Sequence, residues 1–289
     1  MQYTNKLNLP APIVEAVKRD TYSRGEASYS ATGLLRPPQM AALYDNYSDY
    51  ISKDVSEELW TLFGSAVHLI LEGTKAPEYV PEERLYCAVD GVRLSGQIDV
   101  QHIQPDGSRV LQDYKTRKAY GVMNNDSDEK QLNIYRYIAM QNDIEVSGLQ
   151  VINLIKDWSR HEAERREGYP PTDIYIQDIP IWSDQKIESF VKERIRLHEE
   201  AANGNAILCT DDERWLRDEK FAVMKEGRKR AVRVFDSMEE AETFIAAQKD
   251  ADKHIVDHRR GQPTRCISFC DVRDFCPQFA TFKQENSFE

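Results

Sequence analysis

The sequence predicts an α/β fold in which helices flank a mixed central sheet. Three observations support this class. A helix-like stretch at 56–73 is followed by strand-like stretches between 79 and 115. An Asp-Gly pair divides the first two strand-like runs, as in an antiparallel hairpin. Helix, strand and helix patterns then follow at 127–141, 149–155 and 183–204.

The helix expected at 56–73 is the clearest in the chain. Ser56 is a candidate cap, Glu57 and Glu58 suit the positive end of the helix dipole, and Gly73 is a stop signal. A shorter helix is expected after the hydroxyl residues near position 30, within RPPQMAALYDNY. Together these segments form the N-terminal helical part of the predicted core.

Three strands are expected between 79 and 115. Asp90 and Gly91 form the turn of the hairpin, and PDG at 105–107 predicts a second turn before the strand RVLQDYK. The later helix at 183–204 ends at Gly204. The first part of the chain, residues 1–208, therefore reads as one α/β core.

The pattern of expected secondary structure changes at Cys209. The segment predicts a β-hairpin that turns near Gly227, then a helix whose Ser237 and Glu240 have the spacing of a capping box, and last a cysteine-rich tail. We expect residues 209–289 to form a C-terminal ββα and Cys-rich appendage that packs on the core.

The composition excludes some functions. The net charge is −11, with 38 Lys and Arg against 49 Asp and Glu, which argues against a protein that merely coats nucleic acid. No run of eighteen apolar residues predicts a membrane span, and the N-terminus lacks the apolar stretch of a signal peptide. We therefore expect an intracellular protein with no membrane partner.

Acidic residues on two neighbouring strands predict a metal site. Asp99 and Asp113 lie on strands expected to be adjacent and antiparallel, so their carboxylates should lie side by side. Paired carboxylates bind hard cations such as Mg²⁺ or Mn²⁺. Lys115 is two residues beyond Asp113, on the same strand face, where it could stabilise a developing negative charge. The alternative is a surface ion pair of little energetic value.

Four short motifs decide between these alternatives. The motifs are GSAVH at 64–68, GQID at 96–99, DYK at 113–115 and QLNIY at 131–135, in the order helix, strand, strand, helix. With these four motifs the sequence resembles the RecB-like branch of the PD-(D/E)XK nuclease superfamily, and its layout is similar to that of phage-type exonucleases. The resemblance covers roughly residues 28–155 and implies a restriction-endonuclease-like core.

The resemblance also implies roles for individual residues. His68 would be a metal ligand together with Asp99 and Asp113, although a lone histidine on an apolar helix is more commonly a core residue. Gln131 and Tyr135 are four residues apart on one helix face, which suits contact with DNA or support of the catalytic site. The alternative for that pair is a core tyrosine beside an exposed glutamine.

Two further positions near the site are less clear from the sequence. Glu82 or Glu83 could join the site from the preceding strand, but a charged strand edge explains both equally well. Tyr114 alternates with Asp113 and should therefore face the opposite side of the sheet.

The cysteines predict a second metal centre. Three of them lie within eleven residues of the tail, and Cys209, which opens the C-terminal segment, is the expected fourth ligand. AddB and cysteine-containing CRISPR-associated nucleases resemble this arrangement and imply a [4Fe–4S] cluster. In those proteins the distant Cys precedes the GxxxH helix, and this chain has none there. The expected set is Cys209, Cys266, Cys270 and Cys276.

Zinc is the alternative for this centre. His254 and His258 have an i, i+4 spacing that would suit two ligands on one helix, or two solvated helix residues. Cys87 lies in the middle of an expected strand and reads as a small core residue. We favour a cluster over zinc, with the role of attaching the C-terminus to the core.

The expected substrate is DNA, either single-stranded or with free ends. The basic run KEGRKRAVR predicts a DNA-contacting patch of Lys225, Arg228, Lys229 and Arg230, with a solvated turn as the alternative. The resemblance implies a Mg²⁺-dependent exodeoxyribonuclease of recombination or DNA processing, working with a recombination partner protein in the cytoplasm, or in that of the host if a phage encodes it. A structure-specific endonuclease and a non-catalytic DNA-binding module are the alternatives.

Overall fold

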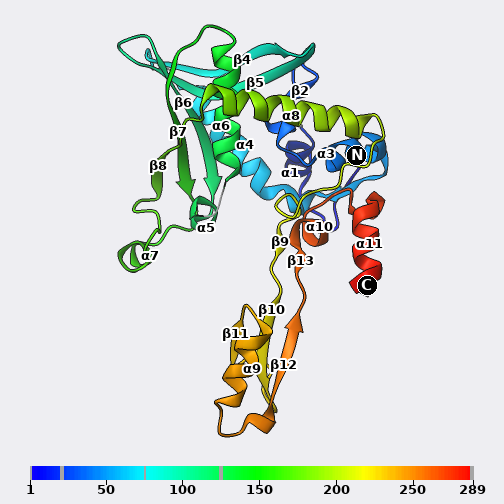
Figure 1. Ribbon diagram of the computed structural model, residues 1–289. Coiled ribbons are helices and arrows are strands. Elements are labelled where there is room, and N and C mark those ends of the chain that lie inside the picture. The colour runs from blue at the N-terminus through cyan, green and yellow to red at the C-terminus, as the bar shows by residue number, and fades with distance from the viewer. Residues whose placement is uncertain (1, 20–22, 75, 124–125, 287–289) are drawn as a thin grey trace. The chain divides into compact units, whose positions relative to one another are not determined.

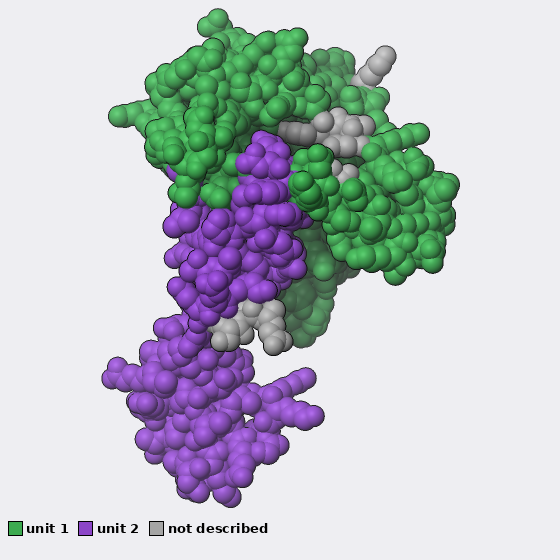
Figure 2. Space-filling view, turned by 90° about the vertical axis from the view of Figure 1, so that its right-hand side faces the viewer, with its two compact units in different colours: residues 1–42, 48–206 green, residues 43–47, 207–289 purple. Residues whose placement is uncertain are grey.

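The computed structural model describes residues 2–19, 23–74, 76–123 and 126–286 (Figure 1). The chain divides into two compact units, which are coloured separately in Figure 2. Unit 1 comprises residues 1–42 and 48–206, and unit 2 comprises residues 43–47 and 207–289.

A mixed six-stranded sheet is the centre of unit 1, with the order β2-β5-β6-β7-β8 and β4 paired to β5. The predicted α/β class with a mixed central sheet is therefore confirmed. Neighbouring strands are antiparallel except for the pairs β2–β5 and β6–β7. The strands are β2 Tyr29–Ser30, β4 Tyr79–Val89, β5 Val92–Ile103, β6 Arg109–Arg117, β7 Val146–Ile155 and β8 Ile174–Asp178.

The β4–β5 hairpin forms where the sequence predicts it. Asp90 and Gly91 are the two turn residues, and both have positive φ, 50° and 85°. A two-residue turn with positive φ at both positions matches the right-handed twist of the flanking strands, which explains the preference for Asp-Gly. The turn at Gly107 also has positive φ, 89°, and leads into β6.

The edge of β5 that faces β6 is only partly paired. The strand pairs with β4 along one edge over nearly its whole length. Along the other edge it pairs with β2 at Leu94 and Ser95, and with β6 at residues 100–103. Residues 96–99, the GQID stretch, lie between these two ladders. The sheet therefore opens at this motif.

Helices cover both faces of β6. Gln131 of α6 (Ser127–Met140) bonds Asp113, and a Cβ at Gly64 of α4 (Leu59–Glu72) would lie 3.4 Å from Thr116 Oγ1. Asp113 and Thr116 are three residues apart in a strand, so they point to opposite faces. Most of α6 is buried, including Leu132, Ile134 and Ile138, whereas no residue of α4 is fully buried.

The helix α8 (Asp184–Ala202) packs against α6 and completes the main core with its periodic apolar residues, among them Ile187, Val191 and Ile195. Ser183 caps α8 by accepting a hydrogen bond from the backbone N–H of Lys186 at 3.3 Å. The remaining elements of unit 1 are short. They are β1 Gln2–Thr4, α1 Ala11–Lys18, α2 Ala31–Leu34, β3 Ser52–Asp54, α5 Ala119–Met123 and α7 Arg160–Arg165, with 3₁₀ turns at Ser48–Tyr50 and Val55–Glu58.

The start of the α4 segment differs from the prediction. Asp54, not Ser56, is the cap: Oδ1 of Asp54 accepts hydrogen bonds from the backbone N–H and the hydroxyl of Ser56. The first turn is a 3₁₀ helix, and α4 proper begins at Leu59. The carboxylate also bonds Thr4 and the backbone of Lys6, which the local sequence around position 56 does not indicate.

Unit 2 contains a small sheet of order β11-β10-β12 with one helix, α9, packed on it. In Figure 1 these elements form a module connected through β9 and β13 to the rest of unit 2. The bounds are β9 Leu216–Arg217, β10 Lys220–Lys225, β11 Arg233–Phe235, α9 Met238–Ala246, β12 His254–Arg259 and β13 Gln262–Pro263. The tail holds α10 Thr264–Ser268, a 3₁₀ turn at Arg273–Phe275 and α11 Pro277–Asn286, and a further 3₁₀ turn at Ala251–Lys253 precedes β12. The helix α3, Pro38–Tyr47, contains the sequence boundary between the two units.

The predicted hairpin and capped helix are present in this module, since β10 and β11 pair antiparallel and Ser237 accepts a hydrogen bond from the Glu240 N–H at 3.2 Å. The helix ends at Ala246, however, and His254 and His258 lie in β12. Four residues of strand separate their Cα atoms by about 13 Å. The proposed pair of helical zinc ligands is therefore wrong.

None of the helices in the described chain is long and apolar enough to span a membrane.

Candidate active site

The opening of the sheet places Asp99 in the candidate site. The β5–β6 ladder ends at Val100–Gln112, one residue short of Asp99 and Asp113. Oδ2 of Asp99 accepts a hydrogen bond from the backbone N–H of Tyr114 at 2.8 Å, so the carboxylate takes the place of a ladder partner. Both carboxylates line one cavity of about 610 Å³.

A second cluster surrounds Asp113, whose side chain is 2 % exposed. Nζ of Lys115 lies 2.6 Å from Oδ2 of Asp113, and that buried oxygen has no hydrogen-bond partner of ordinary angular geometry. The other oxygen, Oδ1, accepts a hydrogen bond from Nε2 of Gln131 at 2.7 Å. The same amide nitrogen donates to the hydroxyl oxygen of Tyr135 at 3.0 Å. The predicted i, i+4 pair therefore supports Asp113 from α6.

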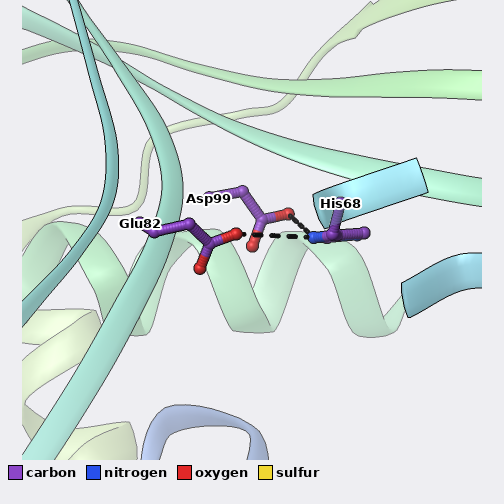
Figure 3. A group of neighbouring side chains, drawn as sticks. All are labelled: His68, Glu82 and Asp99. Atoms are coloured by element: carbon purple, nitrogen blue, oxygen red, sulfur yellow. Dashed lines mark ion pairs between the residues drawn. The ribbon is translucent and has the colours of Figure 1, made fainter. Parts of the chain in front are cut away.

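His68 reaches the site from α4. Its Nε2 lies 3.1 Å from the carbonyl oxygen of Tyr114. Because a carbonyl can only accept, Nε2 carries the proton, and Nδ1 faces the carboxylates. Nδ1 lies 3.7 Å from Oε1 of Glu82 and 3.6 Å from Oδ2 of Asp99, as the dashed lines in Figure 3 show. The backbone of β6 thus orients the ring toward the acids, as outer partners orient ligating histidines in metal sites.

Glu82 is the site residue that the sequence leaves undecided. The structure distinguishes it from Glu83, whose Oε2 accepts hydrogen bonds from Gln101 at 2.5 Å and Arg109 at 3.0 Å. Glu82 has φ 49°, a left-handed conformation that is uncommon for a residue with a side chain. Strain of this kind costs on the order of 1–3 kcal/mol and occurs preferentially at functional sites. In the β4–β5 ladder Pro81 lies opposite Val100 and Glu83 lies opposite Ile98, so Glu82 is left out of the pairing.

The ligand atoms of His68, Glu82 and Asp99 all lie within 4.8 Å of one another (Figure 3). Two carboxylates and an imidazole suit a divalent cation, so the residues present fit a hard metal ion. Asp113 lines the same cavity outside this group, and its Oδ2 is paired with Lys115. The geometry therefore brings Glu82 together with two of the predicted ligands, His68 and Asp99.

Electrostatics in the cavity also favour a bound cation. Burial, followed by the negative charge of the nearby Asp113, raises the pKa of Asp99 to about 7. The neighbouring carboxylate of Glu82 raises the pKa of His68. Burial opposes the charge of Lys115, but the neighbouring Asp113 outweighs it and the pKa of Lys115 is raised. Crowded negative charge of this kind is relieved by a positive ion.

In unit 2, Cys209 lies close to the cysteine tail. The side chain of Gln278 accepts a hydrogen bond from the Cys209 N–H at 3.0 Å and donates one to the Cys209 carbonyl at 2.9 Å. Burial, followed by the nearby Glu213 and the thiols of Cys276, Cys266 and Cys270, raises the pKa of Cys209 to about 12. Within the described chain, no three of these sulfurs lie within 4.8 Å of one another. Cys87 belongs to unit 1 and packs against its core.

The predicted DNA-contacting residues of unit 2 surround the β10–β11 turn, where Gly227 has φ 77°. Lys225 is paired with Asp250. Arg228, Lys229 and Arg230 are exposed, and none of them forms an ion pair with a described residue. Three of the four residues therefore present unneutralised positive charge to solvent.

One protein-family model matches most of this chain. The family model described as the PD-(D/E)XK nuclease superfamily matches residues 72–277. No curated protein matches the chain. Ten chains of solved structures match, among them one described as the crystal structure of SSO0001, at 16% identity, with 64% of this chain and 84% of that chain covered and a TM-score of 0.47. Since the family model spans more than half of the chain and contains Asp99, Asp113 and Lys115, the chain belongs to the PD-(D/E)XK nuclease superfamily.

Proposed function

We propose that this protein is a Mg²⁺-dependent exodeoxyribonuclease of RecB-like type that acts in recombination or DNA processing. Membership of the superfamily indicates a metal-dependent nuclease. The observation that carries the proposal is the meeting of His68, Glu82 and Asp99 with the Asp113–Lys115 pair in one cavity. Preference for DNA ends and the recombination role rest on the resemblance of the four motifs.

The roles of the residues follow from their contacts. His68, Glu82, Asp99 and Asp113 would hold the ion, which when bound would polarise the scissile phosphodiester and lower the pKa of an attacking water. Lys115 remains charged beside Asp113 and can stabilise negative charge that develops on the phosphate. Gln131 and Tyr135 hold the Asp113 carboxylate in position from α6.

The function is tested by incubating the protein with linear duplex, covalently closed circular and single-stranded DNA, with and without Mg²⁺. We expect cleavage of the linear and single-stranded substrates only when Mg²⁺ is present. Rapid cutting of the closed circle would favour a structure-specific endonuclease with the same metal site. Binding of DNA without any cleavage would favour a non-catalytic module.

We further propose a metal centre at Cys209, Cys266, Cys270 and Cys276, and a [4Fe–4S] cluster as its occupant. The Gln278 bonds to the Cys209 backbone support this ligand set, because Gln278 is only two residues beyond Cys276. The choice of a [4Fe–4S] cluster over zinc rests on the resemblance of the cysteine-rich tail to that of cluster-containing nucleases.

The position of the thiols also suggests how the C-terminal part is organised. We propose a nuclease core over residues 1–208 and a C-terminal appendage over residues 209–289. Cys209 precedes the β10–β12 module and the other three cysteines follow it, so a cluster would fasten the base of that module. Arg228, Lys229 and Arg230 on the same module would contact the phosphates of DNA. The proposal includes no membrane partner.

A further inference from the structure

The active-site cavity extends beyond the candidate metal ligands. Its lining includes Arg84 of β4, Gln97 of β5 and Ser23, in addition to the acids described above. Mg²⁺ chemistry at one phosphodiester does not require these three residues. A cavity that can take several nucleotide groups needs contacts to more of the strand than the phosphate being cut.

Arg84 is held in the cavity wall by neutral partners. Its Nη2 donates to the backbone carbonyl of Ser23 at 2.6 Å and to Oε1 of Gln97, and its Nη1 donates to the hydroxyl of Ser95 at 3.4 Å. Of the five N–H groups of a guanidinium, the Nε–H and one N–H on Nη1 have no described acceptor.

The charge of Arg84 is also not balanced by a neighbouring acid. Within the described chain no carboxylate oxygen lies within 4.0 Å of its guanidinium, whereas Arg109 is paired with Glu83 and Arg117 with Asp128. A half-buried arginine that is oriented by carbonyl and amide groups retains its full charge for an incoming anion. The anion that enters this cavity in a nuclease is a DNA phosphate.

The spacing along the sheet relates Arg84 to the metal ligands. Arg84 lies opposite Gln97 in the β4–β5 register, and Gln97 is two residues before Asp99. Two residues of strand span about 6.8 Å, which is similar to the separation of neighbouring phosphates along one DNA strand. Gln97 also donates from Nε2 to Oε2 of Glu82 at 2.6 Å, so one side chain connects Arg84 to the metal group.

We propose that Arg84 binds the phosphate of the substrate strand next to the one that is cut. The inference rests on the proposed nuclease function and adds the group that holds the neighbouring nucleotide. Arg84 keeps its full charge and two N–H groups, on Nε and on Nη1, each of which can donate to a phosphate oxygen. With one phosphate at the metal ligands and the next at Arg84, two points of the strand are held. The position of the scissile bond and the direction of the strand through the cavity are then both fixed.

The primary test uses the unaltered protein with Mg²⁺ and single-stranded oligonucleotides in which one phosphate is replaced by an uncharged methylphosphonate. The replacement is moved one position at a time along the strand. We expect one position next to the cut to lower kcat/KM by about 10- to 100-fold, as expected for the loss of a charged hydrogen bond. Parallel substrates with a 5′-phosphate or a 5′-hydroxyl show whether that phosphate is internal or terminal.

The second arm uses Arg84→Gln, Arg84→Lys and, as a matched control, Arg93→Gln. Arg93 lies on β5, outside the cavity lining, and is paired with Glu26. Arg84→Gln should lower kcat/KM on the unmodified strand by a similar factor and show little further loss on the methylphosphonate strand, because both changes remove the same contact. Arg84→Lys should retain part of the rate, and Arg93→Gln should behave like the unaltered protein.

Each outcome separates this inference from the proposed function. If the unaltered protein cleaves DNA but no single methylphosphonate next to the cut lowers the rate, the phosphate contact is overturned and the nuclease stands. If the losses from Arg84→Gln and from the methylphosphonate simply multiply, Arg84 acts only as a structural tether for Ser23. If the unaltered protein cleaves none of the unmodified strands, the proposed function falls, and this inference falls with it.

Discussion

The carboxylate of Asp99 accepts a hydrogen bond from the backbone N–H of Tyr114 at 2.8 Å, across the point where β5 and β6 separate. One side chain thus satisfies a backbone donor that the sheet leaves open and presents its charge to the cavity. The ligand atoms of His68 and Glu82 meet Asp99 beside this opening, all within 4.8 Å of one another.

The Asp113–Lys115 pair should be indispensable for cleavage. Asp113→Asn removes a ligand charge, and we expect Mg²⁺-dependent cleavage to be lost while the thermal unfolding midpoint changes little. Lys115→Ala should retain binding of the divalent ion and lower kcat by about 100-fold or more, because a charge partner of the transition state is removed. Full activity of either variant, measured on end-labelled DNA, would contradict the assignment.

Glu82 and Glu83 form a matched pair for testing the metal group. Glu82→Gln should weaken Mn²⁺ binding by at least about 10-fold, measured by calorimetry or by the electron paramagnetic resonance of free Mn²⁺. Glu83→Gln should leave that affinity unchanged, because Glu83 bonds Gln101 and Arg109 instead of facing His68. Equal effects of the two substitutions would remove Glu82 from the ligand set.

Gly96 should tolerate no side chain. A Cβ at this position would lie 2.9 Å from both Ile138 Cδ1 and Tyr135 Cδ1 of α6. Gly96→Ala should therefore destabilise the protein by about 1–3 kcal/mol and lower activity, because α6 must move away from β5 with Gln131 and Tyr135. Gly64→Ala is the control, since its Cβ would meet only Thr116 Oγ1 at 3.4 Å. Denaturant unfolding measures both, and a similar cost at the two positions would contradict the packing argument.

The C-terminal cysteines should hold a metal. Protein purified without oxygen should be brown with broad visible absorption if it carries an iron–sulfur cluster, or colourless with about one zinc per chain if it carries zinc. Cys270→Ala should lower metal content and make residues 209–289 sensitive to proteolysis. Cys87→Ala should do neither, since Cys87 belongs to unit 1 and packs against its core. Freshly reduced protein without iron or zinc would refute the centre.

The basic turn should affect processivity more than the first cut. Neutralising Arg228, Lys229 and Arg230 removes three unpaired positive charges from the β10–β11 turn, so DNA should dissociate sooner between cuts. We expect shorter runs of digestion on long linear DNA and a weaker dependence of binding on salt. The rate of the first cut on a short oligonucleotide is the comparison, and an equal loss in both assays would place the turn in the catalytic step.

The sequence by itself determined the main helices and strands of residues 56–155 and their order, because these depend on local periodicity, whereas the four motifs follow from the family resemblance. Asp113 and Lys115 share a strand face by their spacing of two, and Gln131 and Tyr135 share a helix face by their spacing of four. The Asp90-Gly91 turn is likewise a local property, since it requires positive φ at both residues.

Only the tertiary structure decided which of several similar side chains faces the site. Glu82, and not Glu83, faces the site because Glu82 itself has a left-handed backbone conformation within β4. The alternation of side chains along a strand does not predict this conformation. Asp54 replaces Ser56 as a cap because Thr4 and Lys6, fifty residues away, supply it with further hydrogen bonds. His254 and His258 are separated because their segment is recruited as the third strand beside β10, where pairing outweighs the local helical pattern.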